Sequence, residues 1–198
     1  MNIDPVMIGA TGANLASLKF AFKRLGIDIE VSDDPVRLRA ATHVLLPGVG
    51  AARSAMDRLE QAGLVDVIPA LETPVLGICL GMQLLFSHSD EEDVACLGII
   101  DAIIERLPDA SGLTIPEMGW NQIECTEPSA LTDGIDSGDY AYFVHSYAAP
   151  VGPYTRAVTT YGVPFSAVVE QGNFFGTQFH PERSSRAGSQ ILDNFLRI

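Results

Sequence analysis

The sequence predicts an α/β fold in which a mostly parallel central sheet is covered by helices on both faces and extended by antiparallel strands. In the first half of the chain, short and wholly apolar runs alternate with segments of helical periodicity, as in parallel sheets buried on both faces. In the second half, strand-like runs are joined by Gly, Pro and Asp turns, which is typical of antiparallel pairs. No repeat, linker or low-complexity segment interrupts the chain, so we expect residues 1–198 to form one domain.

The first half of the chain is expected to supply four strands and four helices. Apolar residues recur at helical spacing from residue 15 to 25, and Gly26 is a typical residue to end that helix. Asp34-Pro35 is a typical helix start, and Pro47-Gly48 is expected to stop the third strand. The expected strands cover residues 6–8, 27–31, 43–46 and 75–78, and the expected helices cover 15–25, a short segment from 35, 51–61 and 80–86.

The second half is expected to be rich in strands. Gln171-Gly172-Asn173 separates two strand-like runs and is typical of a hairpin turn. The expected strands cover residues 99–104, 121–125, 140–147, 167–170 and 174–179, and a final helix covers 189–196. Antiparallel strands of this half are therefore expected to extend the parallel sheet.

The composition excludes several classes of protein. The chain has 198 residues, of which 47% are hydrophobic, so it can bury a full core. A net charge of −13 disfavours general binding to nucleic acid. No apolar run approaches the roughly 20 residues of a membrane helix, and the first residues lack a cationic signal segment. Three cysteines without regular spacing argue against a disulfide framework. We expect a soluble, cytoplasmic protein.

The clearest chemical motif is Gly77-Ile78-Cys79-Leu80-Gly81, where a buried strand turns directly into a helix. This is the nucleophile-elbow pattern with cysteine in place of serine. Small residues must flank so tight a turn, and N–H groups at the helix start can stabilise a thiolate or a developing oxyanion. We interpret Cys79 as a nucleophile; the alternative is a buried structural cysteine beside two packing glycines. Cys96 and Cys125 lack this setting and are expected to be structural.

A cysteine that attacks an amide needs an imidazole to carry protons, and His180-Pro181-Glu182 is the best candidate. Pro181 favours an extended conformation at His180, and Glu182 can then reach the ring and orient it. The alternative is a surface turn with a local charge contact. The other three histidines rank lower: His145 either lines a pocket or packs in the core, and His43 and His88 are expected to be structural or exposed.

The sequence predicts neither a metal nor a cofactor, because it has no histidine pair at metal-ligand spacing and no Cys-x-x-Cys. Pro47-Gly48-Val49-Gly50 is a second glycine-rich turn after a strand. It could bind a phosphate or be plain turn chemistry, but it lacks the spacing of nucleotide-binding loops. A second oxyanion donor beside Cys79 is the simpler interpretation.

These three motifs occur in the order used by the class I (triad) glutamine amidotransferases, which the chain resembles along nearly its whole length. The resemblance implies that family's flavodoxin-like α/β fold. Met118-Gly119-Trp120-Asn121 and residues 142–147, Tyr-Phe-Val-His-Ser-Tyr, are similar to one branch, the glutaminase subunits of imidazole glycerol phosphate synthase.

The resemblance implies a role for each site residue. Cys79 would form a glutamyl thioester, His180 would act as general base and then acid, and Glu182 would orient His180. The backbone N–H groups of Val49 and Leu80 would form the oxyanion hole. The glutamine-binding residues would be Gly50, Gln83, Glu91 (pairing with the α-ammonium group), Ser146 and Tyr147. The residues at the partner interface and ammonia gate would be Trp120, Asn121, Tyr142 and Arg183.

The resemblance also implies a partner. In that branch the glutaminase forms a heterodimer with a (β/α)₈-barrel cyclase, which receives the ammonia and makes imidazole glycerol phosphate and an aminoimidazole carboxamide ribotide for histidine synthesis. Three positions depart from the usual pattern: residues 9–15 replace an Asp-Tyr-Gly opening, Glu117 replaces a histidine, and Arg183 replaces a common lysine. We expect these departures to lie towards the partner interface.

Three other functions remain open at this point. The first is a glutaminase subunit that supplies another synthase, such as pyridoxal phosphate synthase. The second is a cysteine hydrolase or peptidase that uses the same elbow. The third is a redox-sensing relative in which Cys79 is an oxidisable thiol, which the intact His180-Pro181-Glu182 motif disfavours.

Overall fold

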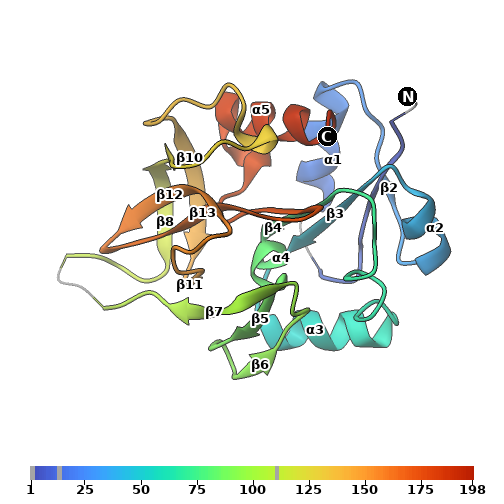
Figure 1. Ribbon diagram of the computed structural model, residues 1–198, viewed down its shortest axis with the longest axis horizontal. Coiled ribbons are helices and arrows are strands. Elements are labelled where there is room, and N and C mark those ends of the chain that lie inside the picture. Colours follow the sequence, from blue (N-terminus) through green and yellow to red (C-terminus); the bar gives the residue numbers. More distant parts are fainter. Residues whose placement is uncertain (1–2, 13–14, 110–111) are drawn as a thin grey trace.

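The computed structural model describes residues 3–12, 15–109 and 112–198 (Figure 1). Ala13 and Asn14, part of the departing segment 9–15, lie outside the described residues. Within the described ranges, no helix has both the length and the apolar character needed to cross a membrane.

The central sheet has the mixed topology that the sequence predicts. Its strand order is β2-β1-β3-β4-β14-β13-β12-β9. Strands from β2 to β14 run parallel, and β13, β12 and β9 are antiparallel to their neighbours. The bounds are β1 (Pro5–Met7), β2 (Glu30–Val31), β3 (His43–Gly48), β4 (Val75–Cys79), β9 (Glu124–Cys125), β12 (Thr155–Tyr161), β13 (Val163–Gln171) and β14 (Phe174–Thr177).

Helices cover both faces of this sheet (Figure 1). Buried residues of α1 (Leu15–Arg24) and α5 (Ser185–Phe195) share one core cluster with one face of the sheet. Buried residues of α2 (Pro35–Ala40) and α3 (Ala52–Gln61) belong to a second cluster. Helix α4 (Leu80–Gln83) follows β4 without a loop. The α/β class with two covered faces is therefore confirmed.

Two smaller sheets lie beside the central one. A four-stranded sheet has the order β11-β7-β5-β6, with β11 (Tyr147–Ala148), β7 (Ile100–Arg106), β5 (Phe86–Ser89) and β6 (Val94–Ala95). The other is an antiparallel ribbon of β8 (Glu117–Gln122) and β10 (Tyr140–His145), called the β8–β10 ribbon below. Its register pairs Trp120 with Tyr142 and Glu117 with His145, so these two pairs lie on opposite faces of the ribbon.

Several expected boundaries were wrong. Pro47-Gly48 does not stop β3, because both residues still pair with the end of β4. The expected helix 80–86 ends at Gln83, and Phe86 begins β5, which pairs with β7. Helix α5 begins at Ser185 rather than at 189, and β2 holds only residues 30–31 of the expected 27–31. The expected strand 121–125 is divided between β8 and β9, and the expected strand 140–147 between β10 and β11.

Candidate active site

Cys79 forms the expected elbow between β4 and α4. Its backbone angles are φ 54° and ψ −114°, which is a strained conformation for a residue with a side chain. A Cβ atom on Gly77 would lie 2.7 Å from the Gly81 carbonyl oxygen, and one on Gly81 would lie 1.7 Å from the Leu46 carbonyl oxygen. Close backbone packing therefore requires both flanking glycines, as the motif predicts: Gly77 packs against α4, and Gly81 packs against β3.

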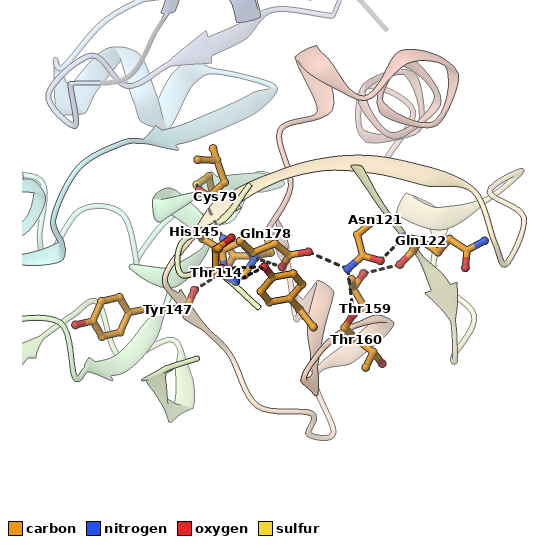
Figure 2. Close-up of polar contacts among 12 residues, drawn as sticks. Cys79, Thr114, Asn121, Gln122, His145, Tyr147, Thr159, Thr160 and Gln178 are labelled. Carbon is orange, nitrogen blue, oxygen red and sulfur yellow. Dashed lines mark hydrogen bonds and ion pairs between the residues drawn. The ribbon is translucent and has the colours of Figure 1, made fainter. Parts of the chain in front are cut away.

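The Cys79 thiol lies in a buried polar setting. The residue is 7% exposed. Its Sγ is 3.9 Å from the Val144 carbonyl oxygen, to which it donates, and 3.9 Å from Nε2 of Gln178, from which it accepts (Figure 2). Because α4 has only four residues, its contribution to stabilising a thiolate is smaller than the expected longer helix would give.

His180 and Glu182 form a buried pair. Nδ1 of His180 lies 3.0 Å from Oε1 of Glu182, and both side chains are almost fully buried. His180 is extended, with φ −92° and ψ 100°, but the 3₁₀ turn η2 (Pro181–Arg183) then carries Glu182 back to the ring. The expected contact is therefore present, although a turn makes it rather than a continuous extended segment. Ser184 fixes this turn by donating to the His180 carbonyl oxygen and accepting from the Tyr142 N–H.

The charges around His180 favour its protonated form. Burial by itself lowers the pKa of His180, but contacts with the Cys79 thiol and with Glu182 outweigh it and raise the pKa to about 10. An imidazole beside a sulfur atom is the arrangement in which the ring carries the proton of a cysteine nucleophile.

A cavity of about 170 Å³ opens beside this imidazole. Val49, Val144, His180, Glu182 and Arg183 contribute to its walls, together with apolar side chains of α1, β3 and β4. Of the residues expected at the oxyanion and glutamine sites, only Val49 lines it. The cavity therefore lies against His180, Glu182 and Arg183.

The glycine-rich turn after β3 lies against the elbow. Gly48 pairs in register with Cys79, and a Cβ atom on Gly48 would lie 2.7 Å from the Gly81 N atom. Val49 follows directly and is 40% exposed, and Gly50 has φ 92°, in the region that favours glycine. The structure thus brings the Val49 segment beside the start of α4, where Leu80 supplies the other expected N–H donor.

The expected glutamine-binding residues lie on α4, on β11 and in the loops next to them. Gln83 is buried and donates to the Tyr147 carbonyl oxygen at 2.8 Å and to Oε1 of Gln178 at 3.0 Å. Oε2 of Glu91 accepts from the N–H of Ala52, two residues after Gly50. Burial raises the pKa of the Glu91 carboxyl, the Ala52 hydrogen bond opposes this, and the charge of Glu92 adds to it.

Ser146 and Tyr147 connect the β8–β10 ribbon to β7. The Ser146 carbonyl oxygen accepts from the N–H of Leu107, and the Tyr147 carbonyl oxygen accepts from Gln83. Their backbone is thus fixed next to Gln83.

Three of the four expected interface residues meet on the outer face of the ribbon. The Trp120 and Tyr142 rings are 6.0 Å apart in an edge-to-face arrangement, and the Arg183 guanidinium lies 5.6 Å from the centre of the Tyr142 ring. Trp120 is 52% exposed, and Met118 and Tyr140 share its face. An exposed aromatic and apolar cluster of this kind is typical of a docking surface.

The structure does not bring Asn121 into that cluster. Its Nδ2 donates to Oε1 of Glu117 at 2.8 Å and to the Thr160 carbonyl oxygen at 3.0 Å, on the opposite face of β8. The expectation that Glu117 lies towards an interface was wrong for its side chain, which is 4% exposed and faces His145. Sequence reasoning also missed Gln178, although its position two residues before His180 on an apolar strand end was a usable signal.

The sequence and the fold of the chain are similar to those of known proteins. The family described as "Glutamine amidotransferase class-I" matches residues 10–198. Proteins named "Imidazole glycerol phosphate synthase subunit HisH" are 50% identical in Xanthomonas euvesicatoria, where 98% of each chain is covered, and 46% identical in Vibrio cholerae, where 100% of each is covered. A crystal structure of a glutamine amidotransferase has a TM-score of 0.73 at 22% identity, with 97% of each chain covered. The structure of a putative GMP synthase protein from Thermoplasma acidophilum has a TM-score of 0.76 at 17% identity, covering 100% of this chain and 94% of that one.

Proposed function

The chain belongs to the class I glutamine amidotransferases, and we propose from this premise that it is the glutaminase subunit of an imidazole glycerol phosphate synthase. In this role it hydrolyses glutamine to glutamate and passes the ammonia to a partner subunit for histidine biosynthesis. Residues 1–198 act as one glutaminase domain, and the cytoplasm is the proposed compartment. One observation carries the proposal: a cysteine at a strained elbow contacts an imidazole that a buried carboxylate holds.

The reaction begins with attack by Cys79 Sγ on the side-chain amide carbon of glutamine. The N–H groups of Val49 and Leu80 stabilise the oxyanion. His180, which has taken the thiol proton, donates it to the departing ammonia, and a glutamyl thioester remains on Cys79. His180 then removes a proton from a water molecule that attacks the thioester, and glutamate leaves. Glu182 keeps Nδ1 of His180 protonated and the ring in place throughout.

The substrate is held by groups around the elbow. Glu91 binds the α-ammonium group, and the Ser146–Tyr147 backbone binds the α-carboxylate. Gly50 and Gln83 complete the site. Both amide hydrogens of Gln83 are engaged, so its oxygen is left to accept from the substrate.

The partner is a (β/α)₈-barrel cyclase that forms a heterodimer with this chain. Trp120, Tyr142 and Arg183 supply the docking surface and the ammonia gate, with Asn121 supporting them from the inner face of β8. The support is their exposure and mutual contact on the β8–β10 ribbon, next to the cavity beside His180.

The test is a glutaminase assay with the barrel cyclase and its nucleotide ligand present and absent. We expect weak turnover by the chain alone, a marked increase in the complex, and glutamine-dependent formation of imidazole glycerol phosphate. Glutamine turnover without cyclase binding would favour another synthase, such as pyridoxal phosphate synthase. Cleavage of peptides but not of glutamine would overturn the proposal in favour of a cysteine peptidase.

A further inference from the structure

A continuous set of buried polar contacts runs from Cys79 to the inner face of the β8–β10 ribbon (Figure 2). Its members are Gln178, Gln83, the Tyr147 carbonyl, His145 and Glu117. None of Gln178, His145 and Glu117 belongs to the triad, the oxyanion hole or the substrate-binding residues, so their burial next to the site needs another explanation.

Gln178 is the member that touches the nucleophile. Its side chain is fully buried, its Nε2 donates to Cys79 Sγ at 3.9 Å, and its Oε1 accepts from Gln83 at 3.0 Å. The amide of Gln178 therefore cannot rotate without losing both contacts. A fixed N–H donor directed at sulfur limits where that sulfur can lie.

His145 fixes the other end of this contact. Its Nδ1 lies 2.8 Å from the Tyr147 carbonyl oxygen, which also accepts from Gln83 at 2.8 Å. A carbonyl oxygen only accepts hydrogen bonds, so Nδ1 carries a proton. The Tyr147 carbonyl is thus held between two donors, and Gln83 is held in turn.

Glu117 holds the His145 ring. Oε2 of Glu117 lies 3.1 Å from Nε2 of His145, and both side chains are 4% exposed or less. The carboxylate thus contacts the ring nitrogen that does not face the Tyr147 carbonyl. Asn121 fixes the other carboxylate oxygen. A buried pair of this kind contributes little net stability, which favours a role in orientation.

We propose that Gln178, His145 and Glu117 are positioning residues for the glutamine-hydrolysing step, which hold Cys79 and the Tyr147 carbonyl through Gln83. The proposal rests on the glutaminase function above and deepens it. In this proposal, the hydrogen bond from His145 Nδ1 to the Tyr147 carbonyl oxygen affects the reaction. The contact of His145 with Glu117 holds the ring in place.

Two isosteric variants of His145 separate positioning from a merely structural role. In His145→Asn, the side-chain amide nitrogen lies near the place of Nδ1. It keeps the hydrogen bond to the Tyr147 carbonyl oxygen but loses the contact with Glu117. In His145→Gln, the side-chain amide lies near the place of Nε2. It keeps the contact with Glu117 but loses the hydrogen bond to the Tyr147 carbonyl oxygen. Positioning predicts that the Asn variant is the more active and the Gln variant the more stable. A structural role predicts that activity follows stability.

The experiment measures three quantities for Gln178→Leu, His145→Asn and His145→Gln. The first is the pair of kinetic constants kcat and KM for glutamine in the complex with the cyclase. The second is the rate at which iodoacetamide alkylates Cys79, measured by peptide mass spectrometry. The third is the urea concentration at the midpoint of unfolding. Asn173→Ala, which removes contacts to Leu71 and Thr73 at the far end of β4 and β14, is the control for lost stability alone.

We expect kcat and the alkylation rate to fall about tenfold or more in Gln178→Leu and severalfold in His145→Gln. For comparison, a misplacement of about 1 Å costs roughly a hundredfold in rate. Folded Gln178→Leu and His145→Gln proteins with wild-type kcat and alkylation rates would overturn the proposal, as would a His145→Asn protein slower than His145→Gln. Alkylation needs no glutamine. The order of the variants by alkylation rate therefore tests the positioning of Cys79 even if the wild-type chain proves not to hydrolyse glutamine.

Discussion

Nδ1 of His180 lies 3.0 Å from Oε1 of Glu182, and the two side chains are only 11% and 6% exposed. Burial lowers the pKa of His180, but the Cys79 thiol and the Glu182 carboxylate outweigh this effect and raise it. The geometry therefore links the protonation of the imidazole to the presence of the Glu182 carboxylate.

Glu182→Gln is expected to weaken this link. A folded-state pKa of about 10, raised from 6.5, gives stability that is fully present below pH 6.5 and is lost as the pH rises through 10. Removal of the carboxylate lowers the pKa of His180, so the variant should lose less stability between pH 7 and 10 than the wild type does. Urea unfolding at both pH values measures this.

The matched control for Glu182→Gln is Glu170→Gln, which removes a partly buried carboxylate 3.4 Å from Arg156 and outside the triad. This control should lower the free energy of unfolding by similar amounts at the two pH values. An unchanged pH dependence in Glu182→Gln would contradict the assigned role of the carboxylate.

Gly81→Ala should destabilise the fold, because its Cβ would lie 1.7 Å from the Leu46 carbonyl oxygen. We expect a loss of about 3 kcal/mol or more in the free energy of unfolding. Gly63→Ala is the control: Gly63 has φ 68° with open space around it, so only about 1–2 kcal/mol of backbone strain is expected. Equal losses in the two variants would show that close packing at the elbow is not the cause.

Glu91→Gln should weaken glutamine binding. The variant keeps an oxygen for the Ala52 N–H but loses the charge that pairs with the α-ammonium group. An increase in KM of about 10–100-fold is expected from a lost charged contact of about 1.5–3 kcal/mol, with a smaller change in kcat. The exposed neighbour Glu92→Gln should leave KM unchanged. A normal KM in Glu91→Gln would place the ammonium group elsewhere.

Trp120→Ala should weaken binding of the cyclase and leave the chain itself stable. Trp120 is 52% exposed, so its removal should change the free energy of unfolding by no more than about 0.5 kcal/mol. A central aromatic interface residue contributes about 2 kcal/mol or more, or roughly 30-fold in Kd, measurable by calorimetry. Ile103→Ala, an exposed apolar residue on β7, is the control. Equal Kd values for both variants would exclude the β8–β10 ribbon as the docking surface.

The apolar strands, the elbow at Cys79 and the contact between His180 and Glu182 were predictable from the sequence. Strands β1, β3 and β4 are continuous apolar runs, and such runs indicate burial on both faces. The elbow was predictable because few residue patterns permit a side chain at positive φ between two close-packed glycines. The His180–Glu182 contact was predictable because the two residues are close in sequence.

Other features depend on tertiary contacts that local patterns do not carry. Strand β12 has three threonines and an arginine and was not expected, and it forms because β13 and β9 flank it. Strand β5 follows α4 after only two leucines, with no glycine or proline between them, which is why the helix was expected to continue. The inward direction of Glu117 depends on the register between β8 and β10, which pairs it with His145.

The central claim is that Cys79 carries a glutamyl group during turnover. Acid quenching of the complex with the cyclase during glutamine hydrolysis, followed by peptide mass spectrometry, tests it most directly. The account predicts a glutamyl adduct on the Cys79 peptide that is absent from Cys79→Ala, which should also release no ammonia, whereas Cys96→Ala should retain both. Full ammonia release by Cys79→Ala, or steady turnover with the adduct on another residue, would contradict it.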